Sequence, residues 1–297
     1  MRFRVGYLSM IPVMIGLTIM VQAAAPLAYE GFSLTFPQYN TGSGFNGAWQ
    51  QGGFNVFASG YGASDTSLSF GALQTSGGRV TSPAFTAING AVRNLAQALG
   101  ADNTTTYLSV VLRPEGTLNG GVFNGFFGVT LNGSLGNELF VGKPGALATS
   151  EYVLENRGGF GQVSSGVPTV VGQATLLVVR ADFLAGNDLF TLYVNPAPGA
   201  PEPTAGVTKA DLNLGSVSRL GIYSTGAFSV DEIRLGASYA DVTPRSPFTG
   251  TAGAANCHGK TVAALAQQYG GLPNAAATLG YASVAALQDA ITGFCGN

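Results

Sequence analysis

The sequence predicts an all-β fold in which two antiparallel sheets pack as a β-sandwich over residues 26–245, followed by a small α-helical tail. Short runs rich in Val, Phe, Tyr and Leu, such as residues 54–58 and 107–112, are bounded by clusters of Gly, Asn, Asp and Ser. Turn signals recur about every ten residues. Helical patterns are scarce before the tail, which favours packed antiparallel sheets over a parallel α/β fold.

The first residues are typical of an export signal. Arg2 and Arg4 form a basic start, residues 5–21 are apolar, and small residues at 21–25 offer a cleavage site. We therefore expect a signal peptide over residues 1–25 and a secreted, periplasmic or cell-surface protein. A retained anchor is the alternative, although the apolar run is short for a spanning helix and contains Pro12. No later segment is apolar for long enough to span a bilayer.

The middle of the chain contains one clear hairpin and two ambiguous segments. Residues 176–179 form a continuous apolar run, and after a Gly-Asn-Asp turn at 186–188 the chain returns over residues 189–194. Residues 92–99 have the propensity of a helix. Residues 195–211 contain four prolines and predict a long loop, either a solvated connector or a binding loop.

Residues 227–244 read as the closing strand of the β-domain. Phe228, Val230 and Ile233 suit a half-buried strand, but the adjacent Asp231 and Glu232 break strict alternation. Neighbours on a regular strand point to opposite faces, so one of these carboxylates is expected on the buried side, where it needs a partner.

The closing segment, AFSVDEIRLG, resembles the last strand of concanavalin A-like jelly-roll domains of the LamG type in exported bacterial proteins. The other segments that resemble this family are LAYEGFSL at 27–34, GFNGAW at 44–49, GFFGVTLNG at 125–133, ELFVGKPG at 138–145 and LLVVRADF at 176–183. The resemblance implies a jelly-roll sandwich and makes residues 92–99 a strand. It also implies a structural Ca²⁺ held by Glu30 and Asp231, with backbone carbonyls and waters completing the shell. The alternative is that Asp231 is exposed or pairs with Arg234.

The tail is expected to be a disulfide-closed helical unit at 257–297, joined by a linker at 246–256. Residues 261–265 and 283–287 are near copies, each beginning with a hydroxyl residue able to cap a helix. Cys257 and Cys295 are the only cysteines, and an even pair in an exported protein is a disulfide candidate. A unit of fewer than about 50 residues needs such a cross-link.

Composition limits the partners. Charged residues make up 9% of the chain, whereas they make up about 25% of typical domains. The formal net charge of the chain is −2. Nothing is available to neutralise phosphates, so nucleic acid is not an expected partner. A surface of Ser, Thr, Asn and Gly suits neutral ligands such as sugars, and equally an inert spacer.

Catalytic motifs are missing or incomplete. The glycines at 42–47 match a dinucleotide pattern without the strand and helix it requires, and Gly259-Lys260-Thr261 lacks the first glycine of a P-loop. His258 is the sole histidine, which argues against a Ser-His-Asp site and against zinc. Glu138, Glu151 and Glu155 are scattered and form no E-x-D-x-x-E glycosidase motif. We therefore expect no enzyme, with a glycoside hydrolase or lyase as the alternative.

Aromatic side chains are the usual platforms for sugars, because the C–H face of a pyranose stacks on a π face. Trp49, the only tryptophan, with Tyr39 and Tyr61 nearby in sequence, is the predicted ligand-binding set. The alternative for Trp49 is packing in the core. The sequence thus predicts a non-catalytic module that binds a carbohydrate or cell-surface polymer. A structural surface protein without a ligand and a polysaccharide-degrading enzyme are the competing functions.

Overall fold

The structure is a computed structural model that describes residues 25–33, 40–51, 54–55, 61–84, 87–145, 150–250 and 253–296. Apart from Ala25, the predicted signal peptide lies outside these residues. Among the described residues, no helix is both long enough and apolar enough to cross a membrane.

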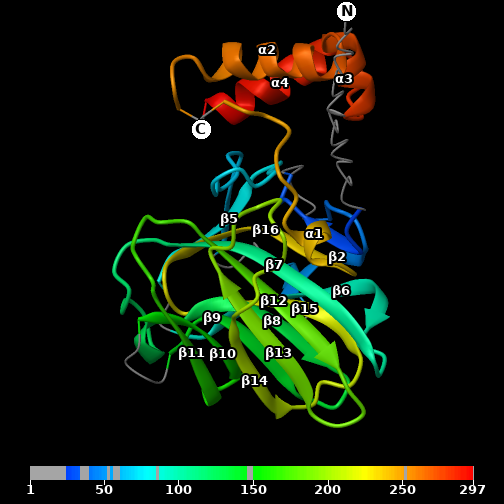
Figure 1. Cartoon of the computed structure of the whole chain (residues 1–297). Coiled ribbons are helices and arrows are strands. Elements are labelled where there is room, and N and C mark those ends of the chain that lie inside the picture. Colours follow the sequence, from blue (N-terminus) through cyan, green and yellow to red (C-terminus); the bar gives the residue numbers. More distant parts are fainter. Residues whose placement is uncertain are drawn as a thin grey trace, which may run out of the picture.

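The described strands form two eight-stranded antiparallel sheets that pack face to face (Figure 1). Sheet A has the order β14 (Val207–Leu212), β13 (Asp188–Val194), β12 (Thr175–Phe183), β7 (Thr104–Pro114), β16 (Phe228–Gly236), β5 (Arg79–Ser82) and β4 (Gly62–Ser64), with β1 (Ala28–Glu30) also paired to β16. Sheet B has the order β11 (Phe160–Pro168), β10 (Glu151–Asn156), β9 (Glu138–Lys143), β8 (Phe127–Gly133), β15 (Val217–Ser224), β6 (Asn89–Leu99), β2 (Phe45–Gln51) and β3 (Phe54–Asn55). The predicted antiparallel jelly-roll sandwich is confirmed.

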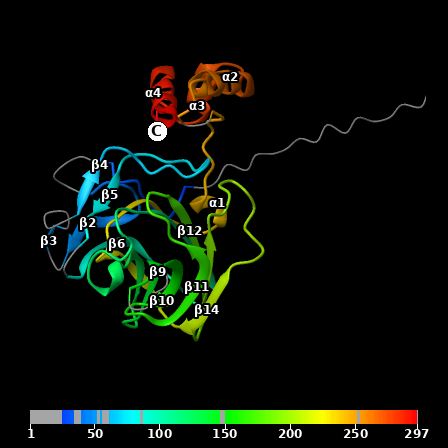
Figure 2. The ribbon, with the colours of Figure 1, turned by 90° about the vertical axis from the view of Figure 1, so that its left-hand side faces the viewer.

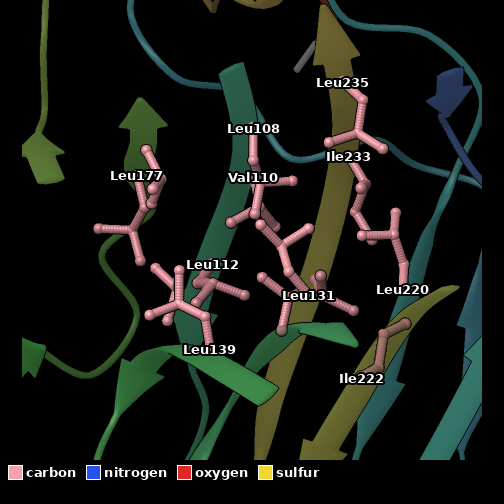
Figure 3. Close-up of a cluster of buried hydrophobic side chains, with 14 of the residues drawn as sticks. Leu108, Val110, Leu112, Leu131, Leu139, Leu177, Leu220, Ile222, Ile233 and Leu235 are labelled. Carbon is pink, nitrogen blue, oxygen red and sulfur yellow. The ribbon is translucent and has the colours of Figure 1, made fainter. Parts of the chain in front are cut away.

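The main core lies between the two sheets, where alternate residues of each strand point inward. Figure 3 shows these side chains meeting: Leu108, Val110 and Leu112 from β7, Ile233 and Leu235 from β16, Leu220 and Ile222 from β15, and Leu131, Leu139 and Leu177 from β8, β9 and β12. Residues 92–99 belong to β6, whose alternating burial places Ala91 and Leu95 in this core. Residues 92–99 therefore form a strand despite their helical propensity, because a strand buries one face of this segment in the core.

The closing strand β16 contains a β-bulge at its two carboxylates. The register with β7 shifts between Asp231 and Arg234, and Glu232 has a left-handed φ of 54°. A bulge inserts one extra residue, so Val230 and Ile233 both remain core-facing although they are three positions apart. The expectation that Asp231 and Glu232 point to opposite faces is wrong, because the hydroxyl of Ser67 lies within hydrogen-bond distance of both carboxylates.

A second apolar layer covers the outer face of sheet A. It includes Leu68 and Leu73 from the segment after β4, Val111 and Val178 from the sheet, and Val242 from the short helix α1 (Tyr239–Val242). The described residues form no such cluster over the outer face of sheet B. The two outer faces therefore differ: an apolar layer covers that of sheet A, and the described residues form no such layer over that of sheet B.

The tail folds into three helices, α2 (Cys257–Tyr269), α3 (Leu272–Thr278) and α4 (Val284–Cys295), grouped beside one end of the sandwich (Figures 1 and 2). The predicted disulfide between Cys257 and Cys295 is present, with Cα atoms 5.6 Å apart. Such a bond persists in an oxidising compartment. Phe248, from the expected linker, packs against Phe294 at 5.4 Å and belongs to the helical core.

One detail of the tail differs from the expectation. Ser283 caps α4 by accepting a hydrogen bond from the Ala286 backbone N–H, as predicted. Thr261 does not begin a helix, because α2 starts at Cys257; its buried hydroxyl instead accepts from the backbone N–H of Gly250. Between α2 and α4, the residues Leu272–Thr278 form the further helix α3.

Candidate functional site

The structure places the predicted sugar-binding aromatics in the interior. Trp49 is 1% exposed and stacks on Phe32 at 6.0 Å, which is the core packing role that the sequence left open. Tyr61 is 3% exposed, and its hydroxyl lies 3.1 Å from that of Ser224. Tyr39 lies outside the described residues. Trp49 and Tyr61 are therefore unsuited to stack on a ligand, because both of their rings are covered by protein.

Glu30, one of the two predicted calcium ligands, is the centre of a buried polar cluster that joins the sheets. Its carboxylate accepts from the Trp49 indole N–H at 3.1 Å and forms an ion pair with Arg93. Arg93 also donates from Nε to the Gly47 carbonyl at 2.9 Å, and its guanidinium lies 4.4 Å from the ring centroid of Phe45. Glu30 belongs to β1 of sheet A and Arg93 to β6 of sheet B, so the ion pair connects the two layers.

The two carboxylates do not fit a shared calcium site. Besides Trp49 and Arg93, Glu30 accepts from the Phe32 backbone N–H and the Thr41 hydroxyl, both at 2.9 Å. Calcium needs oxygen lone pairs that are free to coordinate it, and those of Glu30 face four hydrogen-bond donors. The described residues contain no group of three His, Cys, Asp or Glu side chains that could hold a metal. In this structure Glu30 is an ion-pair partner, with Arg93 in the place of a cation, and a Ca²⁺ ion held by Glu30 and Asp231 stays a prediction.

Asp231 is fully buried, and its carboxylate accepts from the Leu68 backbone N–H at 2.7 Å and from the Ser67 hydroxyl at 2.5 Å. Arg234, the basic residue considered as its partner, pairs with Glu232 instead. Burial raises the pKa of Asp231, and the Glu232 carboxylate raises it further. Burial also raises the pKa of Glu232, against the opposing effect of Arg234. Two adjacent buried carboxylates thus have one arginine beside them, which pairs with Glu232 alone, and this favours retention of a proton on the carboxylate pair.

This pair predicts how stability depends on pH. An unfolded Asp releases its proton near pH 4, whereas the folded Asp231 keeps its proton to a higher pH. The unfolded state then binds fewer protons, so the free energy of unfolding should fall as pH rises above about 4, by at most about 1.4 kcal/mol per pH unit for this group. Asp231→Asn should weaken that dependence in urea unfolding followed between pH 4 and 8. Asp65→Asn, at an exposed carboxylate, is the control, and equal pH slopes in Asp231→Asn and the wild type would contradict the assignment.

The outer face of sheet B carries an aromatic ring on a floor of glycines. Tyr223 in β15 pairs laterally with Gly90 in β6 and Gly128 in β8. A Cβ atom added at Gly90 would lie 2.6 Å from the ring of Tyr223, and one added at Gly221 would lie 2.5 Å from it. The ring can therefore lie against the backbone only because these positions have no side chain.

Charged and amide groups surround the Tyr223 ring. The guanidinium of Arg157 lies 4.3 Å from the ring centroid and forms an ion pair with Glu138, with Nη1 2.9 Å from Oε2. The side chain of Asn132 hydrogen-bonds the Tyr223 phenol, and Arg219 lies near enough to lower its pKa against the raising effect of burial. The platform, as we call Tyr223 with Arg157, Glu138, Asn132 and Arg219, thus combines one aromatic ring with hydrogen-bond donors and acceptors.

The three scattered glutamates lie on this same face. Because Leu139, Tyr152 and Leu154 point into the core, Glu138 in β9 and Glu151 and Glu155 in β10 point outward. Glu151 accepts from the Ser164 hydroxyl, and Glu155 accepts from the Gln162 amide at 2.8 Å. Each of the three carboxylates therefore has its own side-chain partner: Arg157 for Glu138, Ser164 for Glu151 and Gln162 for Glu155.

No family model matches the chain, and no curated protein matches its sequence. Among solved structures it is similar to the globular domain of T. cruzi calreticulin, at 8% identity and a TM-score of 0.38, covering 62% of this chain and 87% of that one. It is also similar to the carbohydrate-binding module CBM66 from Bacillus subtilis, at 10% identity and a TM-score of 0.35, covering 60% and 95%. A third is the endo-1,3-beta-glucanase from Streptomyces sioyaensis, at 9% identity and a TM-score of 0.39, covering 71% and 97%. At this level the similarity concerns the arrangement of strands alone, and nothing about a ligand follows from it.

Proposed function

We propose that the chain is an exported, non-catalytic module that binds a carbohydrate or cell-surface polymer on the outer face of sheet B. The observation that carries the proposal is the Tyr223 ring, held flat on a glycine floor and bordered by polar side chains. A pyranose presents an apolar C–H face to such a ring and hydroxyl groups to its border. An extended polymer also suits an open sheet face better than an enclosed cavity.

Arg157 now occupies the outward side of the ring, so a sugar must displace it or bind beside it. The side chain of Arg157 is 46% exposed, and it follows β10 directly in a turn that contains Gly158 and Gly159. An exposed cation–π contact contributes about 0.5–1 kcal/mol, and an exposed ion pair about 0–1 kcal/mol. Displacing the guanidinium of Arg157 therefore costs little free energy. After the movement the guanidinium remains close enough to donate hydrogen bonds to sugar hydroxyls.

The proposal of a non-catalytic module is supported by the partners of the carboxylates on this face. Glu138 pairs with an arginine, while Glu151 and Glu155 accept hydrogen bonds from Ser164 and Gln162. A hydrolase needs one carboxylic acid and one carboxylate at a fixed distance across the scissile bond. Release of shortened chains from a polysaccharide would overturn this part of the proposal in favour of an enzyme.

Tyr223→Ala should weaken binding to the best ligand of a glycan panel by about fivefold, which corresponds to about 1 kcal/mol for the loss of one aromatic contact. The measurement is a titration of the purified chain with the selected glycan, beside a melting curve of each variant. Leu184→Ala is the matched control, because Leu184 is 42% exposed in the turn after β12, on the other sheet.

Equal affinity of Tyr223→Ala and the wild type would remove the platform from the proposal. Absence of binding to every glycan and cell-wall polymer tested would favour a structural protein without a ligand.

A further inference from the structure

A cleft of about 400 Å³ lies on the outer face of sheet A, on the opposite side of the sandwich from the platform. Its walls come from β7, β12, the loop at residues 195–206 and the start of α1. Its lining includes Tyr107, Arg180, Ala200, Pro201, Glu202 and Ala240. The volume falls in the range of about 300–1,000 Å³ that is typical of small-molecule sites.

The loop that forms one wall is held in a fixed shape. Four prolines, at positions 196, 198, 201 and 203, restrict its φ angles. The backbone N–H of Gly199 donates to the Thr243 carbonyl at 2.8 Å, and that of Asn195 donates to the Leu176 carbonyl at 2.8 Å. The loop therefore delivers Glu202 to the cleft without a large loss of conformational entropy when a ligand binds.

Tyrosine hydroxyls orient the Glu202 carboxylate. Tyr193 donates to Oε1 at 2.8 Å and Tyr107 donates to Oε2 at 2.9 Å. Burial and the nearby carboxylate raise the pKa of Tyr107 to about 12, so its phenol stays protonated and remains a donor at neutral pH. The Glu202 side chain is still 25% exposed. The carboxylate is thus fixed in direction and accessible to a ligand.

The charges that line this region do not balance. Nε of Arg180 lies 3.0 and 2.9 Å from the two oxygens of Asp182, so this guanidinium is already engaged in one ion pair. Its contact with Glu202 is longer, with Nη1 3.5 Å from Oε1. The donors closest to Glu202 are neutral phenols. Two carboxylates thus share one guanidinium, which leaves these three groups with a net negative charge.

We propose that this cleft binds a small organic cation, an alkyl ammonium whose charge pairs with Glu202 and whose aliphatic body packs on Ala200, Pro201 and Ala240. The tyrosine rings support the same ligand class, because their π faces attract cations. Tyr239 packs edge-on against Tyr107 at 6.2 Å and against Tyr193 at 6.1 Å, which keeps the aromatic wall rigid. This site is independent of glycan binding, since it lies on the other sheet.

The test uses pentylammonium as the probe and 1-pentanol as the matched molecule without charge, each titrated into the full chain by calorimetry at low salt. We expect pentylammonium to bind, 1-pentanol to bind at least about tenfold more weakly, and added salt to weaken the ammonium complex. Glu202→Gln should reduce the affinity for pentylammonium about tenfold or more. Glu115→Gln, at a carboxylate that pairs with Arg113 outside the cleft, should leave it unchanged.

Ala240→Leu gives a second variant, which fills the cleft and keeps the charge of Glu202. It should abolish binding with little change in melting temperature, because Ala240 is exposed and leucine is a good helix former. Equal binding of pentylammonium and 1-pentanol would overturn the assignment of a cation. Binding that survives Ala240→Leu, or that is absent from the wild type, would overturn the site.

Discussion

Arg93→Met should lower the free energy of unfolding of the sandwich by about 3–5 kcal/mol, the usual result of removing one partner of a buried ion pair. The substitution leaves the Glu30 carboxylate, which is fully buried, without its cation. The Trp49, Thr41 and Phe32 donors remain, but they are neutral. Urea unfolding at pH 7, followed by the fluorescence of the single tryptophan, measures the effect, because Trp49 is 1% exposed in the same cluster.

The double variant Glu30→Gln with Arg93→Met should recover part of this loss, because it buries no charge. Glu30→Gln alone should cost less than Arg93→Met, since the guanidinium keeps the carbonyl oxygens of Gly47 and Thr41 as acceptors. A loss of under about 1 kcal/mol in Arg93→Met, the size of a surface pair, would show that the ion pair does not connect the sheets energetically.

Replacing both cysteines with serine should unfold the helical unit and leave the sandwich folded. The disulfide closes a loop with a sequence separation of 38 residues, which contributes about 3 to 4 kcal/mol in the chain-entropy treatment. The core of the unit is small; its fully buried members are Leu265, Ala275, Leu287 and Ile291. A unit of this size has little stability beyond what its cross-link provides.

Two signals separate the parts of the molecule in this experiment. Circular dichroism at the helical minimum should drop in the serine variant, while tryptophan fluorescence, which comes only from the sandwich, should follow the wild-type urea curve. A reduced wild type should match the serine variant. Retention of the helical signal in both samples would mean that the helices hold together without the bond.

The strands could be predicted from the sequence where runs of apolar, strand-forming residues are clearly bounded by turn residues. The apolar run at 176–179 and the return at 189–194 lie in β12 and β13, which pair from Leu177 with Val194 to Asp182 with Leu189. The bulge in β16 could not be predicted. A bulge depends on which residues the partner strand offers, and the left-handed backbone at Glu232 has no local signal of the kind that a glycine would give.

The candidate site was harder to predict than the fold. Trp49 stood out because it is the sole tryptophan, yet rarity in the sequence says nothing of burial, and large aromatics contribute most when they are buried. The signal for Tyr223 is the pair of glycines that leave room for its ring, Gly221 in the same strand and Gly90 in a strand that is distant in sequence. That coincidence becomes visible only when the strand pairing is known.

The position of β16 also determines when sheet A can be completed as the chain is synthesised or exported. This strand comes last in the β-domain, but it lies inside sheet A, with β7 along one edge and β5 and β1 along the other. A chain emerging from a ribosome or a translocation pore lacks β16 until residue 236 is free. Until then the edges of β7, β5 and β1 that pair with β16 are exposed, and exposed strand edges favour aggregation. The sandwich therefore closes only after the last strand of the β-domain has emerged, and its many long-range pairings make that closure slow. For the export that we propose, late closure is useful, because a chain that has not yet folded can still be threaded through a membrane.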